Sequence, residues 1–293
     1  MFDPAQLSAL AAVHRRGSFD LAAAELGVSQ SAISQRLRAL EDRVGVVLIR
    51  RGTPSVATEV GLRLIRHHDE VMLLANHLAR ELPGADADRA TLRLAINADS
   101  LATWVIPALA QVNGVLFDLV IDDQDFSEEW LRRGEVAAAV TAHRGPLQGC
   151  DTLPLGALRY RATASPAYIT RWFRDGVTPE ALSRAPALTF SDKDRLQSQW
   201  ITAHFGGNRA LFPSHRIAST HGFVDACLHG LGWGLNPEPL VALHLAQGRL
   251  VEIKPDCPLD VALHWQFARL TEGALRPLTK AMLAAAQAVL VAP

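Results

Sequence analysis

The sequence predicts a protein of mixed α+β and α/β class, with an N-terminal winged helix-turn-helix, a long linker helix and a C-terminal α/β domain of two lobes. Three observations predict this organisation. Two helical runs are broken by Gly27-Val28-Ser29, a stretch compatible with one long helix follows, and strand and helix patterns then alternate to the C-terminus. At 293 residues the chain is also longer than one core comfortably grows. The expected domains are residues 1–57, 58–83 and 91–293.

The composition excludes several classes of protein. The formal net charge is −1, and no window reaches the roughly 18 uncharged apolar residues that a membrane span requires. The N-terminus lacks the pattern of a secretory signal and the three cysteines are scattered, so we expect a cytoplasmic protein with no membrane association. No P-loop, G-x-S-x-G or H-E-x-x-H motif occurs, so no catalytic residues, metal ligands or cofactor are expected.

The first element is a pair of short helices. Apolar residues recur at helical spacing from Phe19 to Leu26, with Ser18 as the expected N-cap, and a second helix begins at Ser29 or Gln30. The polar face of the second helix carries serine, glutamine and arginine. Such a face is either solvated or suited to the DNA major groove, where Gln and Arg can read base edges. The candidate DNA-reading residues are Gln30, Ser31, Ser34, Gln35 and Arg38.

A hairpin follows in the stretch "VGVVLIRRGTPSVATEVG". A short apolar run leads into Arg50 and Arg51, a Gly-Thr-Pro turn comes next, and a second short strand precedes a helix that opens at Thr58. This order predicts a wing beside the two helices. Arginines on a wing contact phosphates and fix the position of the protein on DNA without reading sequence. The alternative for Arg50 and Arg51 is a pair of solvated charges.

The linker is a helix-compatible segment from Thr58 to Leu82, about 37 Å long at the standard rise. Its apolar seam alternates steps of four and three residues, the spacing that packs two helices together. The seam consists of Leu64, His68, Val71, Ala75, Leu78 and Leu82. We expect it to pair with a second copy of the chain, and the alternative is packing against the chain's own C-terminal domain.

The C-terminal domain begins with a strand over 92–96 that turns at Asn97-Ala98-Asp99 into a helix. Exposed amides at this turn, with the Ser100 hydroxyl, can hold a carboxylate, although Asp99 or Ser100 could instead be an N-cap. The next strand ends in Asp122-Asp123, with Asp125 close behind. Ligands of parallel sheets sit beyond the carboxyl ends of strands. These acids form either a solvated acidic loop or, if they face an anion site across a cleft, a site that suits a zwitterion with an extra positive charge.

A second strand and helix set predicts a second lobe. Strand-like runs occupy 160–164, 187–190, 215–219, 233–236 and 250–253, and the run 260–269 returns to the first sheet. We therefore define lobe I as residues 91–158 and 260–293, and lobe II as residues 159–259. Polar residues at strand ends, with one tryptophan, are expected to border the cleft between the lobes. The candidate effector residues are Asn97, Asp99, Ser100, Trp104, Asp122, Asp123, Asp125, Thr141, Thr163, Asp192, Ser219 and Thr220.

The N-terminal motifs resemble those of LysR-type transcriptional regulators. The resemblance rests on Ser18-Phe19, Ala22-Ala23, Leu26, "VSQSAISQRLRALE", "VG" and "TEVG", whereas "LIRR" and the wing proline depart from the usual pattern. It implies an effector domain of the type-II periplasmic-binding-protein kind. It also implies promoter DNA, a homodimer or homotetramer, and RNA polymerase as a candidate partner.

Two further motifs, "NADSLATW" and "LRRGEV", are similar to those of the ArgP/LysG subgroup, which governs arginine or lysine export. This similarity implies a basic amino acid as co-effector and an exporter gene as the target. It places the carboxylate at Ser100 and the side-chain cation near Asp122, Asp123 or Asp125. The main alternative is a nucleoid-type architectural protein with little response to a metabolite. An enzyme with a DNA-binding appendage would need a nucleophile and base pair, which the sequence does not offer.

Overall fold

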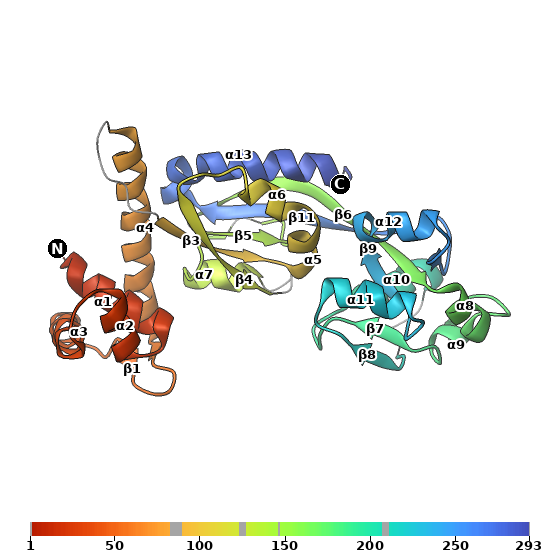
Figure 1. The fold of residues 1–293 in the computed structure, drawn as a ribbon, viewed down its shortest axis with the longest axis horizontal. Coiled ribbons are helices and arrows are strands. Elements are labelled where there is room, and N and C mark those ends of the chain that lie inside the picture. Colours follow the sequence, from red (N-terminus) through yellow and green to blue (C-terminus); the bar gives the residue numbers. More distant parts are fainter. Residues whose placement is uncertain (1, 83–89, 123–126, 146, 207–210, 293) are drawn as a thin grey trace.

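The computed structural model describes residues 2–82, 90–122, 127–145, 147–206 and 211–292. It contains a small N-terminal domain, a long helix and a C-terminal α/β domain of two lobes, which confirms the expected fold class (Figure 1). In the described ranges, no helix is both long enough and apolar enough to cross a bilayer.

The N-terminal domain packs three helices and a two-stranded wing around one apolar core. Ser29 is the N-cap of the third helix, and its hydroxyl accepts the Ala32 N–H. Ser18 is also at an N-cap, but its side chain makes no capping hydrogen bond, contrary to expectation. The first helix was not among the expected elements. The elements are α1 (Pro4–Arg16), α2 (Phe19–Glu25), α3 (Gln30–Val44), β1 (Ile49–Arg50) and β2 (Val56–Ala57).

The wing is fastened to the rest of the domain by polar contacts. Glu41 Oε1 on α3 accepts the backbone N–H groups of Leu48, at 2.8 Å, and Ile49, at 3.3 Å. His14 Nδ1 on α1 accepts the N–H of Ala57 at 3.2 Å. These side chains fix the turn after α3 and the second wing strand, so the wing has a defined position beside the helix-turn-helix.

The linker helix α4 (Glu59–Glu81) has Thr58 as its N-cap, and the Thr58 hydroxyl accepts the Gly61 N–H. The expected seam divides along this helix. Leu64 is half-buried and His68 is buried, so the first part packs within the chain. The second part is open, since the exposed fractions are 47% for Val71, 56% for Leu78 and 53% for Leu82.

A single seven-stranded sheet runs through both lobes in the order β10-β6-β11-β5-β3-β4, and its seventh strand, β9, also pairs with β6. The parallel pairs β3–β4 and β3–β5 lie in lobe I, and β11 is antiparallel to β5 and β6. A short parallel pair, β7–β8, lies in lobe II. The strands are β3 (Ala90–Ile96), β4 (Val115–Ile121), β5 (Ala138–Thr141), β6 (Cys150–Ala164), β7 (Ala187–Thr189), β8 (Ser214–Arg216), β9 (Gly234–Pro237), β10 (Val251–Glu252) and β11 (Leu259–Ala268).

Helices cover the sheet in both lobes, and the long strands β6 and β11 carry the chain between them (Figure 1). The turn at Asn97 leads into a short α5, a π-helical turn (Leu101–Val105) and α6, so the expected single helix is irregular. Three helices of lobe II, α8, α9 and α12, were not expected. The helices are α5 (Ala98–Ser100), α6 (Ile106–Leu109), α7 (Ser127–Arg133), α8 (Pro166–Trp172), α9 (Pro179–Leu182), α10 (Leu196–Phe205), α11 (Thr220–Leu228), α12 (Glu238–Ala246) and α13 (Glu272–Val289), with a 3₁₀ turn at Arg269–Thr271.

Candidate functional site

The outer face of α3 is accessible. Gln30, Ser31, Gln35 and Arg38 are exposed and Ser34 is half-buried, whereas the apolar residues of the opposite face are buried in the domain core. The Ser29 and Ser31 hydroxyls lie 2.9 Å apart, which links the capping residue to the exposed face. This arrangement leaves donors and acceptors of several kinds available to a groove. Their contact with DNA stays a prediction.

The wing arginines lie on the same domain. Arg50 and Arg51 are both exposed, and the Arg51 guanidinium carbon lies 5.1 Å from the centroid of the Phe19 ring on α2. A cation held over an aromatic face loses little freedom when it contacts a phosphate. The wing therefore presents two positive charges beside α2, one of them positioned by the helix-turn-helix itself.

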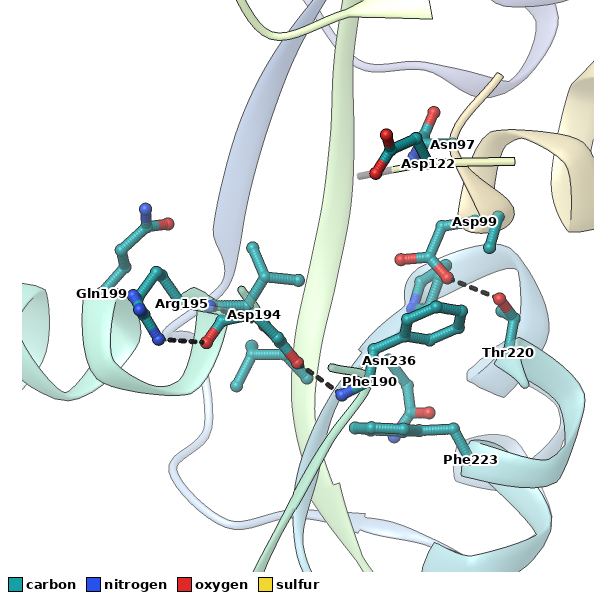
Figure 2. A pocket seen from close by; sticks show the side chains of 14 residues that line it. Asn97, Asp99, Asp122, Phe190, Asp194, Arg195, Gln199, Thr220, Phe223 and Asn236 are labelled. Carbon is teal, nitrogen blue, oxygen red and sulfur yellow. Dashed lines mark hydrogen bonds between the residues drawn. The ribbon is translucent and has the colours of Figure 1, made fainter. Parts of the chain in front are cut away.

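The second site is a cavity between the two lobes. Lobe I contributes the turn into α5 and the end of β4, and lobe II contributes the β7–α10 loop, the start of α11 and β9 (Figure 2). The cavity is narrow, at about 50 Å³. Its lining residues are Asn97, Ala98, Asp99, Asp122, Phe190, Asp194, Arg195, Leu196, Gln199, Thr220, Phe223, Leu235, Asn236 and Pro237.

Asp99 is the most unusual group in this cavity. One carboxylate oxygen accepts the Tyr160 hydroxyl at 2.7 Å, and the other accepts the Thr220 hydroxyl at 2.8 Å. Both bonds join Asp99 of lobe I to residues of lobe II, and Figure 2 shows the one to Thr220. Burial removes water from the carboxylate and raises its pKa, an effect that the two hydroxyl donors only partly oppose. A buried carboxylate held by neutral donors is a costly arrangement, which a cation in the cavity would relieve.

Asp122 is the second acid of the cleft. Its Oδ2 accepts the Trp130 Nε1–H at 2.9 Å within lobe I, and its Oδ1 lies 3.5 Å from Lys193 Nζ on lobe II. Asp122 and Asn97 lie on the same side of the cavity (Figure 2). The other two expected acids, Asp123 and Asp125, fall outside the described residues.

Two asparagines in the lining carry buried polar atoms without a partner in the described part of the chain. Both amide atoms of Asn97 are in this state, as is Oδ1 of Asn236. The Asn236 Nδ2, by contrast, donates to Thr163 Oγ1 at 2.9 Å, so the amide orientation is fixed. Because buried polar groups in native proteins nearly always have partners, these atoms indicate a polar ligand or ordered water.

The β7–α10 loop supplies cavity residues that the sequence did not reveal. Asp194 accepts the N–H groups of Phe190, at 2.8 Å, and Leu196, at 3.0 Å, and so closes the loop on itself. Arg195 NH1 donates to the carbonyl of Asp192 at 3.0 Å. No local pattern marks these positions, because their place in the cleft depends on how lobe II packs. Asn236, in contrast, is the last residue of an expected strand, so its place in the cleft could have been predicted from the sequence.

Six candidate residues do not line the cavity, and each has a physical reason. Trp104 packs in the core of lobe I, and Ser100 is fully buried behind the turn. The hydroxyls of Thr141 and Thr163 bond inside the sheet to Gln266 and Asn236. Ser219 caps α11 on the surface, and Asp192 pairs with Arg216 outside the cleft. These six therefore do not line this cavity, whereas Asn97, Asp99, Asp122 and Thr220 do, and a role of any of them in effector binding stays a prediction.

Among the residues that the structure describes, no three or more His, Cys, Asp or Glu side chains are grouped to hold a metal ion. The buried Cys227 thiol accepts from Asn236 Nδ2 at 3.3 Å, and burial raises its pKa to about 12, so it is a packing group and not a nucleophile.

Two protein-family models match the chain. Residues 4–62 match the bacterial regulatory helix-turn-helix protein model of the lysR family, and residues 85–291 match the LysR substrate binding domain. The HTH-type transcriptional regulator ArgP of Pseudomonas fluorescens (strain Pf-5) is 46% identical over 274 residues, which cover 92% of this chain and 91% of that protein.

Solved structures agree with these matches. The crystal structure of ArgP from Mycobacterium tuberculosis superposes with a TM-score of 0.86 at 40% identity and covers 100% of both chains. Full-length LysG from Corynebacterium glutamicum with bound effector Arg has a TM-score of 0.74 at 35% identity over 99% of each chain.

Proposed function

We propose, because this chain belongs to the LysR family of bacterial helix-turn-helix transcriptional regulators, that it binds promoter DNA and responds to a basic amino acid, arginine or lysine. The DNA is read by the exposed face of α3 and held by the wing arginines. The amino acid binds in the cleft between lobes I and II. An exporter gene for the same amino acid is the proposed target, as the similarity of "NADSLATW" and "LRRGEV" to motifs of the ArgP/LysG subgroup implies.

The observation that carries this proposal is the excess of acceptors in the cleft. Asp99, Asp122 and the Asn236 Oδ1 can all accept hydrogen bonds from a cation. Phe190 and Phe223 line the same cavity and can contact the methylene groups of a long side chain. A basic amino acid has two cationic groups joined by such a chain, so the cleft matches its chemistry.

The carboxylate of the ligand needs donors, and two side chains of the lining offer them. The Asn97 Nδ2 has no hydrogen-bond partner within the described residues, and Arg195 brings a positive charge from lobe II. We propose these groups in place of the buried Ser100 hydroxyl. Asn97 and both acids lie on lobe I, whereas Arg195 and Asn236 lie on lobe II, so one ligand can contact both lobes at once.

The narrow cavity implies movement. A volume of about 50 Å³ is well below the roughly 300–1,000 Å³ of typical small-molecule sites. The lobes must separate, or side chains must rotate, before a free amino acid can enter. Binding is then coupled to the relative placement of the two lobes.

Calorimetry with the twenty amino acids tests the ligand. We expect heat of binding with arginine or lysine and none with acidic or small neutral amino acids. A nucleoid-type architectural protein with little response to a metabolite is the alternative, and it predicts no binding to any of the twenty.

An electrophoretic shift assay with a promoter fragment and a scrambled fragment of equal length tests DNA reading. We expect the promoter fragment to bind more tightly at the same salt concentration, because base contacts by α3 add to phosphate contacts. Equal affinity for both fragments would favour the architectural alternative.

The open part of α4 supports self-association. Val71, Met72, Leu74 and Leu78 on α4 and Leu82 just after it are exposed apolar side chains, and such a stripe is stable in water when a partner covers it. We propose a homodimer through α4, or a homotetramer built from it, acting in the cytoplasm where the promoter lies. Sedimentation at micromolar concentration tests this, and a monomer would contradict it.

A further inference from the structure

The cleft is bridged by a cation of the protein's own. Lys193 Nζ on lobe II lies 3.5 Å from Asp122 Oδ1 on lobe I, at the edge of the cavity that Asp122 lines. We propose that Lys193 is a built-in competitor of the effector: its ammonium takes the place of the effector's side-chain cation at Asp122 until a basic amino acid displaces it. This inference rests on the proposed function, since it concerns the ligand of the same cleft.

The loop that carries Lys193 is held in place. The Lys193 backbone N–H donates to Ser191 Oγ at 3.1 Å, and the Asp194 carboxylate closes the loop through two backbone N–H groups. Asp192 on the same loop pairs with Arg216 of β8. The base of the Lys193 side chain is thus positioned by lobe II, while its ammonium reaches lobe I.

Asp122 divides its two oxygens between the lobes. Its Oδ2 is bound by Trp130 on lobe I, which fixes the carboxylate, and its Oδ1 faces Lys193. An effector cation that enters the cavity therefore meets an acid already oriented for one cationic partner. The effector and Lys193 compete for that position.

The chemistry of Lys193 makes it easy to displace. A distance of 3.5 Å is longer than the 2.7–2.9 Å of a strong charge-assisted hydrogen bond, and 49% of the Lys193 side chain is exposed. Only three of the 29 lysine and arginine residues in the chain are lysines. A lysine is a hydrated point charge, whereas a guanidinium binds a carboxylate through two parallel hydrogen bonds. An arginine effector can therefore displace Lys193 from Asp122. An arginine at position 193 would resist this displacement.

Two substitutions test the proposal in opposite directions by calorimetry with arginine on the full-length chain. An exposed ion pair is weak, so the Lys193–Asp122 pair makes only a modest fraction of the ligand-free molecules unable to bind arginine. Lys193→Gln removes this competition and should tighten arginine binding by roughly two- to sixfold. Lys193→Arg keeps the charge but offers a stronger partner to Asp122, and it should weaken binding by a similar factor. Lys280→Gln, on the exposed side of α13, removes the same charge far from the cleft and should change nothing.

The background Asp122→Asn provides a second check. If Lys193 acts through Asp122, Lys193→Gln should no longer tighten binding in this background, whereas a general charge effect would persist. Weaker binding by Lys193→Gln would mean that Lys193 contacts the ligand directly, and unchanged binding by both Lys193 variants would mean that there is no competition. Either result overturns this inference alone. Absence of arginine and lysine binding in the wild type would instead overturn the proposed function.

Discussion

Asp99→Asn tests the role of the buried carboxylate in ligand binding. Asp99 lies between two neutral donors, Tyr160 and Thr220, and the cation of the effector would be its only charged partner in the proposed complex. Removing one member of a buried charge pair typically costs 3–5 kcal/mol. Taking about 3 kcal/mol, the dissociation constant should rise roughly 150-fold.

Thermal unfolding with and without arginine measures this effect. At a ligand concentration of about 100 times the wild-type Kd, the ligand stabilises the wild type by about 2.7 kcal/mol. The same concentration should stabilise the Asp99→Asn variant by only about 0.3 kcal/mol. For a domain of this size the corresponding rises in Tm are roughly 5–10 °C and about 1 °C.

The variant should not lose stability in the absence of ligand. Burial raises the pKa of Asp99, so its contribution to folding is present below the ordinary value of 3.8 and is lost as the pH rises through the higher folded value. At neutral pH an amide avoids the cost of the buried charge, and its oxygen still accepts a hydroxyl. Asp175→Asn, at an exposed position of lobe II that does not line the cavity, is the matched control and should keep the full shift. A full arginine shift in Asp99→Asn, or a large fall in its ligand-free Tm, would refute this reasoning.

Three further predictions concern the other parts of the chain. Gln35→Ala and Arg38→Ala should each weaken promoter binding by about 1–3 kcal/mol in a shift assay, because base contacts are lost; wild-type affinity for both would argue against α3 as the reading helix. Leu78→Glu puts a charge on the exposed stripe of α4 and should shift the protein towards monomer in sedimentation, and an unchanged oligomer would place the interface elsewhere. His14 accepts the Ala57 N–H, and burial lowers its pKa from the ordinary 6.5, so the unfolded chain binds the proton more readily. Stability in urea unfolding should therefore fall as the pH drops below about 6.5, and His14→Gln should flatten that slope; equal slopes would exclude His14.

Local signals were sufficient for α3 and for the start of α4, although they missed α1. Ser29 and Gly45 bracket α3, and the apolar spacing between them identifies the buried face, so the exposed face follows directly from the sequence. The same holds for α4, whose N-cap is Thr58, the residue expected to open it. What the sequence could not show is how far along α4 the chain covers its own seam, because that depends on how lobe I packs against the helix.

The C-terminal half shows where local reading fails. The strand β6 begins at Cys150, ten residues before the expected start at 160. The earlier start was not expected because Pro154 and Gly156 lie inside the strand, and both residue types usually interrupt strands. The register of β6 on β11 shifts between Leu263 and His264, which accommodates the irregular segment. Residues of the β7–α10 loop, such as Phe190 and Arg195, reach the cleft only through this long strand and its partners, so no short motif could mark them.

The same geometry explains how a ligand in the cleft can influence α3. A ligand shifts an equilibrium only if its affinity differs between two states. A cleft of about 50 Å³ is too small for an amino acid, so the ligand-bound form must differ from this one. Lobe I touches the linker closely, since a Cβ on Gly134 would lie 2.1 Å from Arg66 Cδ on α4. The linker in turn is tied to the DNA-binding domain by the Arg15–Asp69 ion pair. In the homodimer proposed above, a shift of lobe I that keeps this contact would move α4, and with it the spacing of the two copies of α3 on DNA.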